Sequence, residues 1–317
     1  MLNFPGTAFL PSATSTLHPP QNPIANRLDL ARWLVHPDHP LTARVMVNRL
    51  WQSMFGVGLV KTSEDFGVMG ERPSHPELLD WLAVEFMESG WQVNHMLKLM
   101  VSSATYRQSS VVTAEHLSQD PENRFHARGP RLRLDAEVLR DQVLAISGLL
   151  RRDLGGPSVK PYQPAGLWKV VAITGSNTQQ FKRDTGDALY RRSLYTFWKR
   201  TVPPPSMQTF DAPEREFCVV RRSATNTPLQ AFVLLHDPQF VEAARELACR
   251  CLLEASGDDA ARLRFAFLAV VGRPPDQEEQ EMILGLLQSR RAYYQQHQDE
   301  AEMLLQVGDS SAPAALD

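Results

Sequence analysis

Cysteine is scarce in this sequence, which has three, at Cys218, Cys249 and Cys251. Cys249 and Cys251 lie two positions apart on a predicted helix, so their side chains point about 160° apart in projection and cannot share a metal. Cys251 falls on the apolar stripe of that helix and is expected to be buried, reduced and unreactive. The CxxCH motif is absent, which excludes a c-type haem attached within this chain.

The chain also lacks a strong charge of either sign. Its 33 Lys and Arg against 36 Asp and Glu give a net charge of −3. This balance argues against a general nucleic-acid binder, because phosphate contacts need a basic excess. No apolar run approaches the ~18 residues of a membrane span. The N-terminal segment lacks the basic and apolar regions of a secretory signal, so we expect either a cytoplasmic protein or a piece of a longer chain.

Apolar residues at helical spacing are, by contrast, abundant. Hydrophobic residues make up 43% of the sequence, and many recur three and four positions apart, as on a helix packed against a core. The fold class expected is mainly α, an irregular multi-helix bundle with a Pro/Gly-rich, partly β insert. The predicted helices cover residues 27–35, 41–55, 74–89, 94–106, 136–150, 238–255, 259–271 and 277–296.

Several of these helices carry a start signal. Ser74 and Glu77 form the S-x-x-E pattern of a capping box. Proline at the first helical position follows a capping residue in Thr227-Pro228 and Asp237-Pro238. Asn26, Asn94 and Asp276 are the other expected N-caps.

Proline and glycine divide the chain. Residues 1–25 have the composition of a linker or extended arm. We expect residues 26–305 to form a single domain with an N-terminal helical part (26–150), an irregular aromatic and Pro-rich insert (151–215) and a C-terminal helical part (216–305). The aromatic run LYRRSLYTFWKRT in the insert predicts one or two short strands. Residues 306–317 are expected to be a disordered tail.

The helix predicted over residues 41–55 is apolar on most of its circumference, yet it carries Arg44 and Asn48 one turn apart. A buried guanidinium must be paired and hydrogen-bonded, so carboxylates from elsewhere in the chain should converge on it. The expected source is Asp135 or Asp141, near Arg44 or Arg49. A helix of this kind is a plausible organising centre, although its residues do not reveal a reaction.

Arginines recur between residues 107 and 133, where they either recognise an anionic or sugar ligand through forked hydrogen bonds or pair internally with carboxylates. Both interpretations stay open. The candidate ligand-binding residues are Arg44, Asn48, Tyr106, Arg107, Arg128, Asp135 and Trp198. No catalytic residue is assigned. No metal site is assigned either, because the histidines of the HPDHP loop lack a further ligand.

A family resemblance covers residues 22–296. The motifs that carry it include NRLDLARWL, PLTARVMVNRLWQSMFGVGLVKTSEDFG, SHPELLDWLAVEF, DPENRFHARGPRLRLDAEVLRDQ, YRRSLYTFWKRTVPPPSMQTFDAP and TNTPLQAFVLLHDPQFVEAA. Together they resemble the planctomycete PSD domain, a domain of unknown function. Its members usually place this domain at the C-terminal end of a longer secreted protein with a planctomycete cytochrome c domain upstream.

The resemblance implies an extracytoplasmic location, periplasmic or secreted, with haem only in an upstream module and no cofactor within this chain. It implies no catalytic residue, because none is established for the family. The leading hypothesis is therefore a non-catalytic interaction or ligand-binding module that docks a redox partner or a polysaccharide. The alternative is a carbohydrate-active enzyme domain whose pocket is lined by the arginine-rich motifs.

Overall fold

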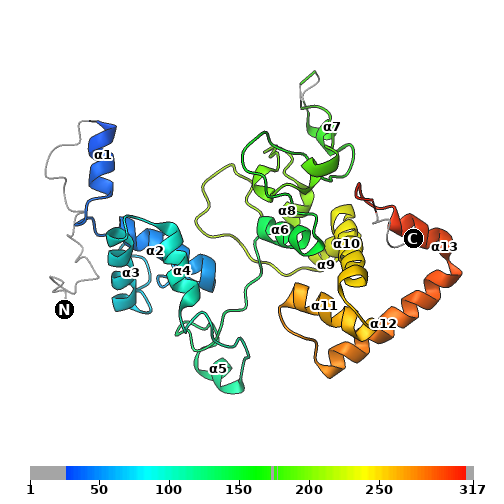
Figure 1. Cartoon of the computed structure of the whole chain (residues 1–317). Helices are drawn as coiled ribbons and strands as arrows, with labels where there is room; N and C mark the ends of the chain where they lie inside the picture. Colours follow the sequence, from blue (N-terminus) through cyan, green and yellow to red (C-terminus); the bar gives the residue numbers. More distant parts are fainter. Residues whose placement is uncertain (1–25, 173–174, 177, 312–317) are drawn as a thin grey trace. The chain divides into compact units, whose positions relative to one another are not determined.

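The computed structural model describes residues 26–172, 175–176 and 178–311, and this part of the chain is mainly α-helical, as predicted (Figure 1). The predicted linker at 1–25 lies outside the described residues. The elements are α1 (Arg27–Leu34), α2 (Thr42–Phe55), α3 (Pro76–Glu88), α4 (Val93–Ser102), α5 (Ala114–Gln119), α6 (Ala136–Ser147), α7 (Leu167–Val171), η1 (Gly186–Tyr190), η2 (Ser193–Tyr195), α8 (Pro205–Thr209), α9 (Pro228–His236), α10 (Pro238–Glu254), α11 (Asp259–Val271), α12 (Gln277–Gln296) and α13 (Gln298–Leu305). Within the described part of the chain, no helix is both long and apolar enough to cross a membrane.

The chain divides into two compact units, with the boundary between Arg133 and Leu134. In the first unit α2 packs against both α3 and α4, drawn in blue and cyan in Figure 1. Their facing sides meet in one apolar cluster, because each helix repeats its apolar residues at helical pitch. The buried members of this cluster are Ala43, Val47, Trp51, Phe55, Leu59, Val60, Leu79, Leu82, Ala83, Phe86, Met96 and Met100.

Asn48 fastens the loop after α2 to that helix. Its side chain is fully buried, accepts a hydrogen bond from the Val60 backbone N–H at 2.9 Å and donates one to the Val60 carbonyl at 3.0 Å. A Cβ at Gly58 would overlap the Asn48 amide group, so only glycine fits at this close approach. The loop can therefore bury Val60 without leaving its backbone groups unpaired.

An aromatic cluster with an embedded histidine closes one end of this core. Trp51 and Phe55 stack with their ring centroids 4.0 Å apart, and the His126 ring lies edge-on at 5.1 Å and 5.3 Å from them. Burial, with the nearby His75 and Arg124, lowers the pKa of His126 from 6.5 to about 4. The imidazole is thus neutral at pH 7 and packs as an aromatic ring.

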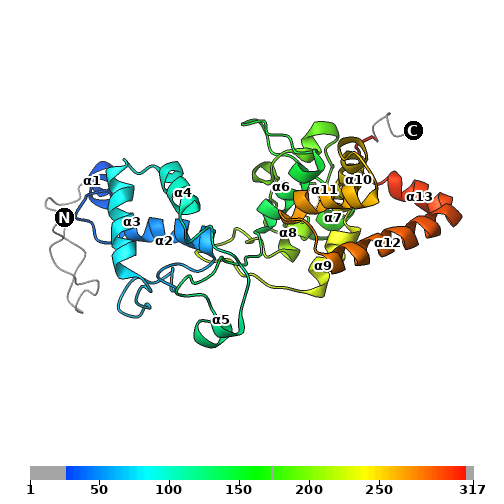
Figure 2. The same ribbon diagram turned by 60° about the horizontal axis from the view of Figure 1, so that its bottom comes forward.

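The second unit is assembled around α6 and α10, which pack against each other (Figure 2). Helix α6 also contacts α8 and η2, while α10 also contacts α9 and α11. Two apolar clusters form its core. The first contains Ala136, Met207, Phe210, Ala212 and Phe240, and the second contains Leu144, Leu189 and Tyr190.

A buried guanidinium attaches the insert to these helices. Arg140 on α6 is only 3% exposed, and it donates to the carbonyls of Leu189 at 2.7 Å and Arg191 at 2.8 Å. Its Nε donates to the Gln239 side chain on α10 at 2.8 Å. Burial lowers the pKa of Arg140 to about 10, which still leaves it protonated at pH 7.

The predicted strands of the insert are wrong. Among the described residues, the segment forms short helical turns and two isolated bridges, Arg151 with Arg191 and Val159 with Thr196. Of the aromatic residues that suggested strands, Tyr190 lies in η1 and Tyr195 in η2, while Phe197 and Trp198 follow η2. The carbonyls at residues 189 and 191 bond to Arg140 and not to a neighbouring strand, so no ladder forms.

Most predicted N-caps are confirmed. Asn26, Thr227, Asp237 and Asp276 each accept a hydrogen bond from the first turn of the following helix. The cap predicted at Asn94 is wrong, because α4 begins at Val93 and Gln92 occupies its N-cap position. The capping box at Ser74 is also wrong. Helix α3 begins at Pro76, so His75 occupies the N-cap position, and the Ser74 backbone instead donates to the Leu59 carbonyl at 2.8 Å.

The disordered tail expected from residue 306 is wrong for its first part. Asp309 and Ser310 donate backbone hydrogen bonds to the buried Glu242 on α10, an attachment that composition gave no reason to expect. Residues 312–317 lie outside the described residues. The buried position predicted for Cys251 is confirmed, at 8% exposure, and Cys249 is equally buried.

Replacing Asn48 by leucine should destabilise the first unit. The change keeps the branching of the side chain but leaves the buried Val60 N–H unpaired, at a cost of roughly 1–3 kcal/mol, and leaves the Val60 carbonyl only the long contact from the Ser63 hydroxyl at 3.4 Å. The midpoint of chemical denaturation, followed by tryptophan fluorescence, should fall accordingly. The same substitution at the exposed Asn94 of α4 is the matched control and should stay within about 0.5 kcal/mol of wild type. Equal effects of the two substitutions would contradict the role given to Asn48.

Acid should weaken the same unit through His126. Because its folded-state pKa lies below the unfolded value of 6.5, the unfolded chain binds the proton more tightly, and stability is fully present above pH 6.5 and lost as pH falls towards about 4. The loss amounts to at most about 3 kcal/mol. Thermal unfolding across this range should show a shallower pH dependence for His126→Phe, whereas His36→Phe, at an exposed histidine, should keep the wild-type slope. An unchanged slope in His126→Phe would show that another group titrates.

Candidate functional site

The second unit contains a cavity of about 380 Å³ in the loop between α8 and α9. This volume falls within the range of small-molecule sites, which is about 300–1,000 Å³. Its walls combine carboxylates, guanidinium groups and apolar side chains. The lining residues are Gln208, Asp211, Ala212, Pro213, Glu214, Arg215, Glu216, Phe217, Val219, Arg221, Arg222 and Ser223.

The two ends of this loop are joined by Asp211. Its carboxylate accepts hydrogen bonds from the backbone N–H and the hydroxyl of Thr225, both at 2.8 Å. Asp211 itself lies in the left-handed region with φ of 60°, where Asp is tolerated better than most residues. The carboxylate therefore fixes the closure of the loop.

Trp198 of the insert braces the loop at its middle. Its indole N–H donates to the Glu214 carbonyl at 3.1 Å, and the guanidinium of Arg215 lies 4.3 Å from the ring centroid. The Trp198 ring also packs against the apolar cluster that contains Met207 and Phe240. A side chain rooted in the core thus sets the position of Glu214 and Arg215 at the cavity wall.

Arg222, near the other end of the loop, forms ion pairs with two carboxylates at the start of α6. Its guanidinium meets Glu137 at 2.6 Å and Asp135 at 3.6 Å. Burial alone would raise the pKa of Glu137, but the hydrogen bond from Arg222, a backbone hydrogen bond and the positive charges of Arg222 and Arg215 together outweigh burial and leave that pKa below its ordinary value. Burial alone would lower the pKa of Arg222, but the hydrogen bond to Glu137 and the negative charges of Glu137 and Asp135 together raise it, so the net shift is upward. Both groups stay charged at neutral pH.

Phe217 is the most exposed apolar side chain of the cavity wall, at 74%. It follows Glu216 and precedes the exposed Cys218. The loop therefore presents one free aromatic face together with charged groups of both signs. An aromatic face of this kind stacks on flat apolar surfaces of ligands.

The first unit contains five of the candidate residues that the sequence suggested, namely Arg44, Asn48, Tyr106, Arg107 and Arg128. Arg44 donates to Asp80 at 2.6 Å and to the Pro40 carbonyl at 2.5 Å, and its side chain is 30% exposed. The sequence-based prediction had named Asp135 or Asp141 as its partner, and it missed Asp80 on α3. Asn48 fastens the loop after α2, as described above.

Arg128 is the buried arginine of the first unit. It is 7% exposed, and it donates to the carbonyls of Asp120 at 3.0 Å and Pro121 at 2.8 Å. Tyr106 lies edge-on to Phe55 with ring centroids 5.7 Å apart, and Arg107 is exposed. These contacts give Arg128 a structural role in shaping its loop.

The second unit contains the other two candidates. Asp135 is the N-cap residue of α6 and lies beside Arg222, and Trp198 braces Glu214. Both therefore border the cavity through a residue that lines it. The sequence did not single out Arg215, Phe217 or Arg222, although the alternation of charged and apolar residues in PEREFCVVRRS was the available signal.

The HPDHP loop has a structural explanation. His39 Nδ1 accepts hydrogen bonds from the backbone N–H groups of Leu41 and Thr42 at 3.3 Å and 3.1 Å, which satisfies orphan donors at the start of α2. Burial lowers the pKa of His39, in keeping with a ring that acts as an acceptor. Across the described ranges, no group of three or more His, Cys, Asp or Glu side chains is placed to hold a metal ion.

Comparison with known proteins gives a family and no further relative. No curated protein and no solved structure matches the chain. A model of the PSD1 family, described as a protein of unknown function (DUF1553), matches residues 26–287, which include the whole loop cavity. Because this match spans most of the 317 residues, the chain belongs to the PSD1 family, as its motifs had predicted.

Proposed function

We propose that this protein is a non-catalytic ligand-binding module and that the loop cavity of its second unit binds a polysaccharide. The observation that carries the proposal is the combination of the exposed Phe217 face with charged groups of both signs around a cavity of about 380 Å³. The resemblance noted in the sequence adds the proposal of an exported protein, periplasmic or secreted, that carries a cytochrome c domain upstream.

The chemistry of a sugar fits these walls. A pyranose has an apolar C–H face that packs on an aromatic ring, while its hydroxyl groups donate to carboxylates and accept from the forked N–H groups of arginine. Phe217 supplies the ring, and Glu214, Glu216 and Arg215 supply polar partners on the same wall. Trp198 holds two of these residues in place through its indole N–H and its ring face.

The charge arrangement favours binding over hydrolysis. A general acid that works near neutral pH needs a carboxyl group with a raised pKa. Glu137, the half-buried carboxylate beside the cavity, has the opposite shift because Arg222 holds it ionised. The carboxylate oxygens of Asp211 accept hydrogen bonds from Thr225. We therefore prefer a module that holds its ligand without cleaving it, and the enzyme hypothesis becomes an outcome of the test.

A glycan array followed by calorimetry on the strongest ligand tests the proposal. Phe217→Ala and Arg215→Ala should each weaken binding about tenfold or more, which corresponds to ~1.4 kcal/mol. Phe232→Ala is the matched control, because Phe232 on α9 is similarly exposed at 57% but is not among the residues that line the cavity. Its affinity should equal that of wild type.

Two results would overturn the proposal. If no glycan binds at millimolar concentration, or if Phe232→Ala weakens binding as much as Phe217→Ala, the cavity is not the polysaccharide site. Prolonged incubation with the bound glycan should release no reducing ends, and their appearance would establish the enzyme instead.

A further inference from the structure

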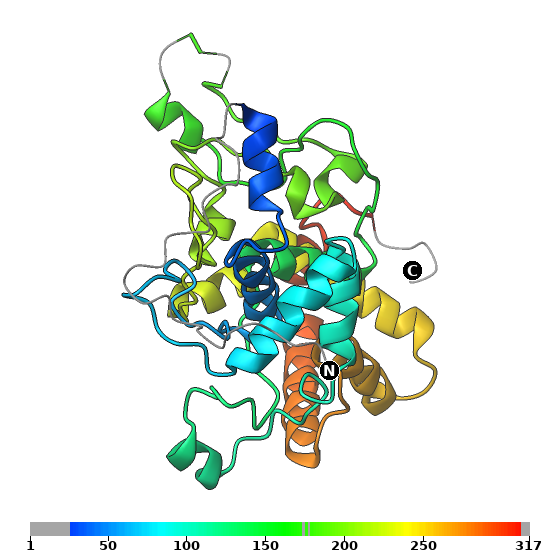
Figure 3. The ribbon, with the colours of Figure 1, turned by 90° about the vertical axis from the view of Figure 1, so that its left-hand side faces the viewer.

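The side chains of the last helices of the second unit remain at least partly exposed to solvent. Helices α11, α12 and α13 contain no buried residue. They follow one another in contact, α10 with α11, α11 with α12, and α12 with α13, and α12 is the long orange helix of Figure 3. After α13 the chain returns to α10, where residues 305–310 are held by hydrogen bonds.

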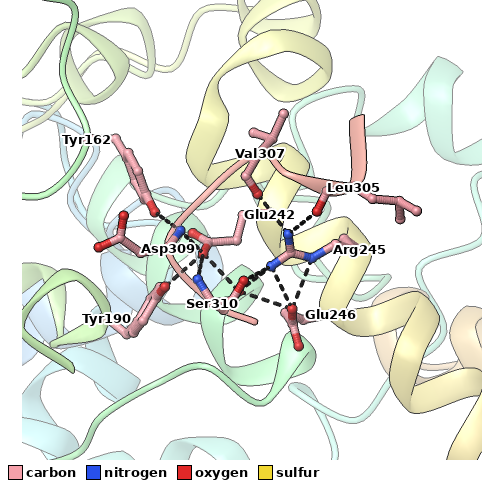
Figure 4. Close-up of polar contacts among 9 residues, drawn as sticks. All are labelled: Tyr162, Tyr190, Glu242, Arg245, Glu246, Leu305, Val307, Asp309 and Ser310. Carbon is pink, nitrogen blue, oxygen red and sulfur yellow. Dashed lines mark hydrogen bonds and ion pairs between the residues drawn. The ribbon is translucent and has the colours of Figure 1, made fainter. Parts of the chain in front are cut away.

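The anchor of this return is Glu242, which is fully buried. Its Oε1 accepts from the backbone N–H groups of Asp309 at 2.8 Å and Ser310 at 2.7 Å, from the Ser310 hydroxyl at 2.8 Å and from the Tyr190 hydroxyl at 2.7 Å (Figure 4). Its Oε2 is buried and has no hydrogen-bond partner among the described residues. One carboxylate oxygen thus collects two consecutive backbone donors of the tail.

Arg245, one turn further along α10, donates hydrogen bonds to carbonyl groups of the same segment. It donates to the carbonyls of Leu305 at 2.5 Å, Val307 at 3.0 Å and Ser310 at 2.5 Å. Glu246 holds it from the side at 2.9 Å, and Figure 4 shows the guanidinium pointing at the returning chain. Because Glu242 takes donors and Arg245 takes acceptors, the pair recognises a peptide backbone.

Two further features, beside the bond from the Ser310 hydroxyl to Glu242, give this recognition sequence specificity. Gly308 has φ of +98°, and a Cβ there would overlap the Glu242 carboxylate, so a side chain is excluded. The Asp309 carboxylate meets Arg183 at 2.7 Å, and the Asp309 N–H also donates to the Tyr162 hydroxyl at 2.8 Å. The preferred segment is therefore Gly-Asp-Ser, with the two phenols kept protonated because burial and Glu242 raise the pKa of both Tyr162 and Tyr190.

We infer that the side chains of Tyr162, Arg183, Tyr190, Glu242 and Arg245 form a peptide-recognition site, and that its partner is the same C-terminal segment of a second copy of this chain. These five residues lie within the family match at 26–287, whereas the occupant at 305–310 lies beyond it. The site is thus separable in sequence from the segment that fills it here.

Exchange between copies is physically accessible. Helices α12 and α13 contain no buried residue, so releasing the arm of α12, α13 and the tail mainly exposes the polar groups of Glu242 and Tyr190, which water can then hydrate. Exchanging an identical element between protomers then restores every contact at low cost. The arm is tethered, which raises its local concentration and favours the closed monomer in dilute solution. Exchanged dimers are expected at high concentration.

The test uses the full chain and a fluorescent peptide with the sequence of residues 303–311, MLLQVGDSS. Gly308→Val expels the chain's own tail, so this variant should bind the peptide at least tenfold more tightly than wild type does. Gly285→Val is the matched control, because a Cβ at Gly285 on α12 meets open space, and it should bind like wild type. A peptide with valine in place of its glycine should not bind, and Gly308→Val combined with Glu242→Gln should lose at least tenfold in affinity.

The second arm identifies the partner. Sedimentation of wild type at rising concentration should show dimers, and Gly308→Val should remain monomeric. If Gly308→Val has a native circular dichroism spectrum yet binds no peptide, the recognition site is refuted. Peptide binding without dimers would refute the second copy as partner. Should Gly308→Val fail to fold, Asp309→Ala with Ser310→Ala loosens the tail without a steric clash and serves in its place.

Discussion

The second unit depends on one buried guanidinium more than on any single apolar contact. Arg140 comes from α6, Gln239 from α10, and the carbonyls of residues 189 and 191 from the insert. Without Arg140 these acceptors would be buried and unpaired, and without them the charge would be unsolvated. Arg140 and these carbonyl groups therefore stabilise each other. The insert has few regular elements of its own, and its bonds to Arg140 fix its conformation. Trp198, and with it the wall of the loop cavity, belongs to this same insert.

The helical part of the fold was predictable because its signals are local. Proline after a capping residue placed the starts of α9 and α10 correctly, and the capping residue Asp276 placed the start of α12. The failures share a physical cause, which is long-range competition for backbone groups. Ser74 has the spacing of a cap, but Pro76 sets the first turn one residue later. The insert has the aromatic content of strands, but Arg140 takes the carbonyls that a ladder would need.

The site was harder to anticipate than the helices. The requirement that a buried guanidinium must be satisfied was sound, but it was applied to Arg44, which is partly exposed, and not to Arg140 or Arg128, which are buried. Both buried arginines are satisfied largely by main-chain carbonyls. Such acceptors exist at every residue and leave no mark in a sequence, whereas carboxylates do. A search for charge partners along the chain was therefore bound to favour Asp135 and Asp141 and to pass over the loop at residues 211–223.

The absence of buried residues in α11, α12 and α13 also divides the second unit by the stability of its parts. Helices α6 and α10 are held by two apolar clusters and by Arg140, so we expect their amides to exchange with solvent only when the whole unit unfolds. The terminal helices are held by the contact of α11 with α10, by their contacts with one another and by the tail at Glu242. We expect their amides to exchange through a smaller opening that leaves the core intact. The chain thus keeps a rigid half that carries the cavity and a detachable half whose protection is set by a few polar contacts at its far end.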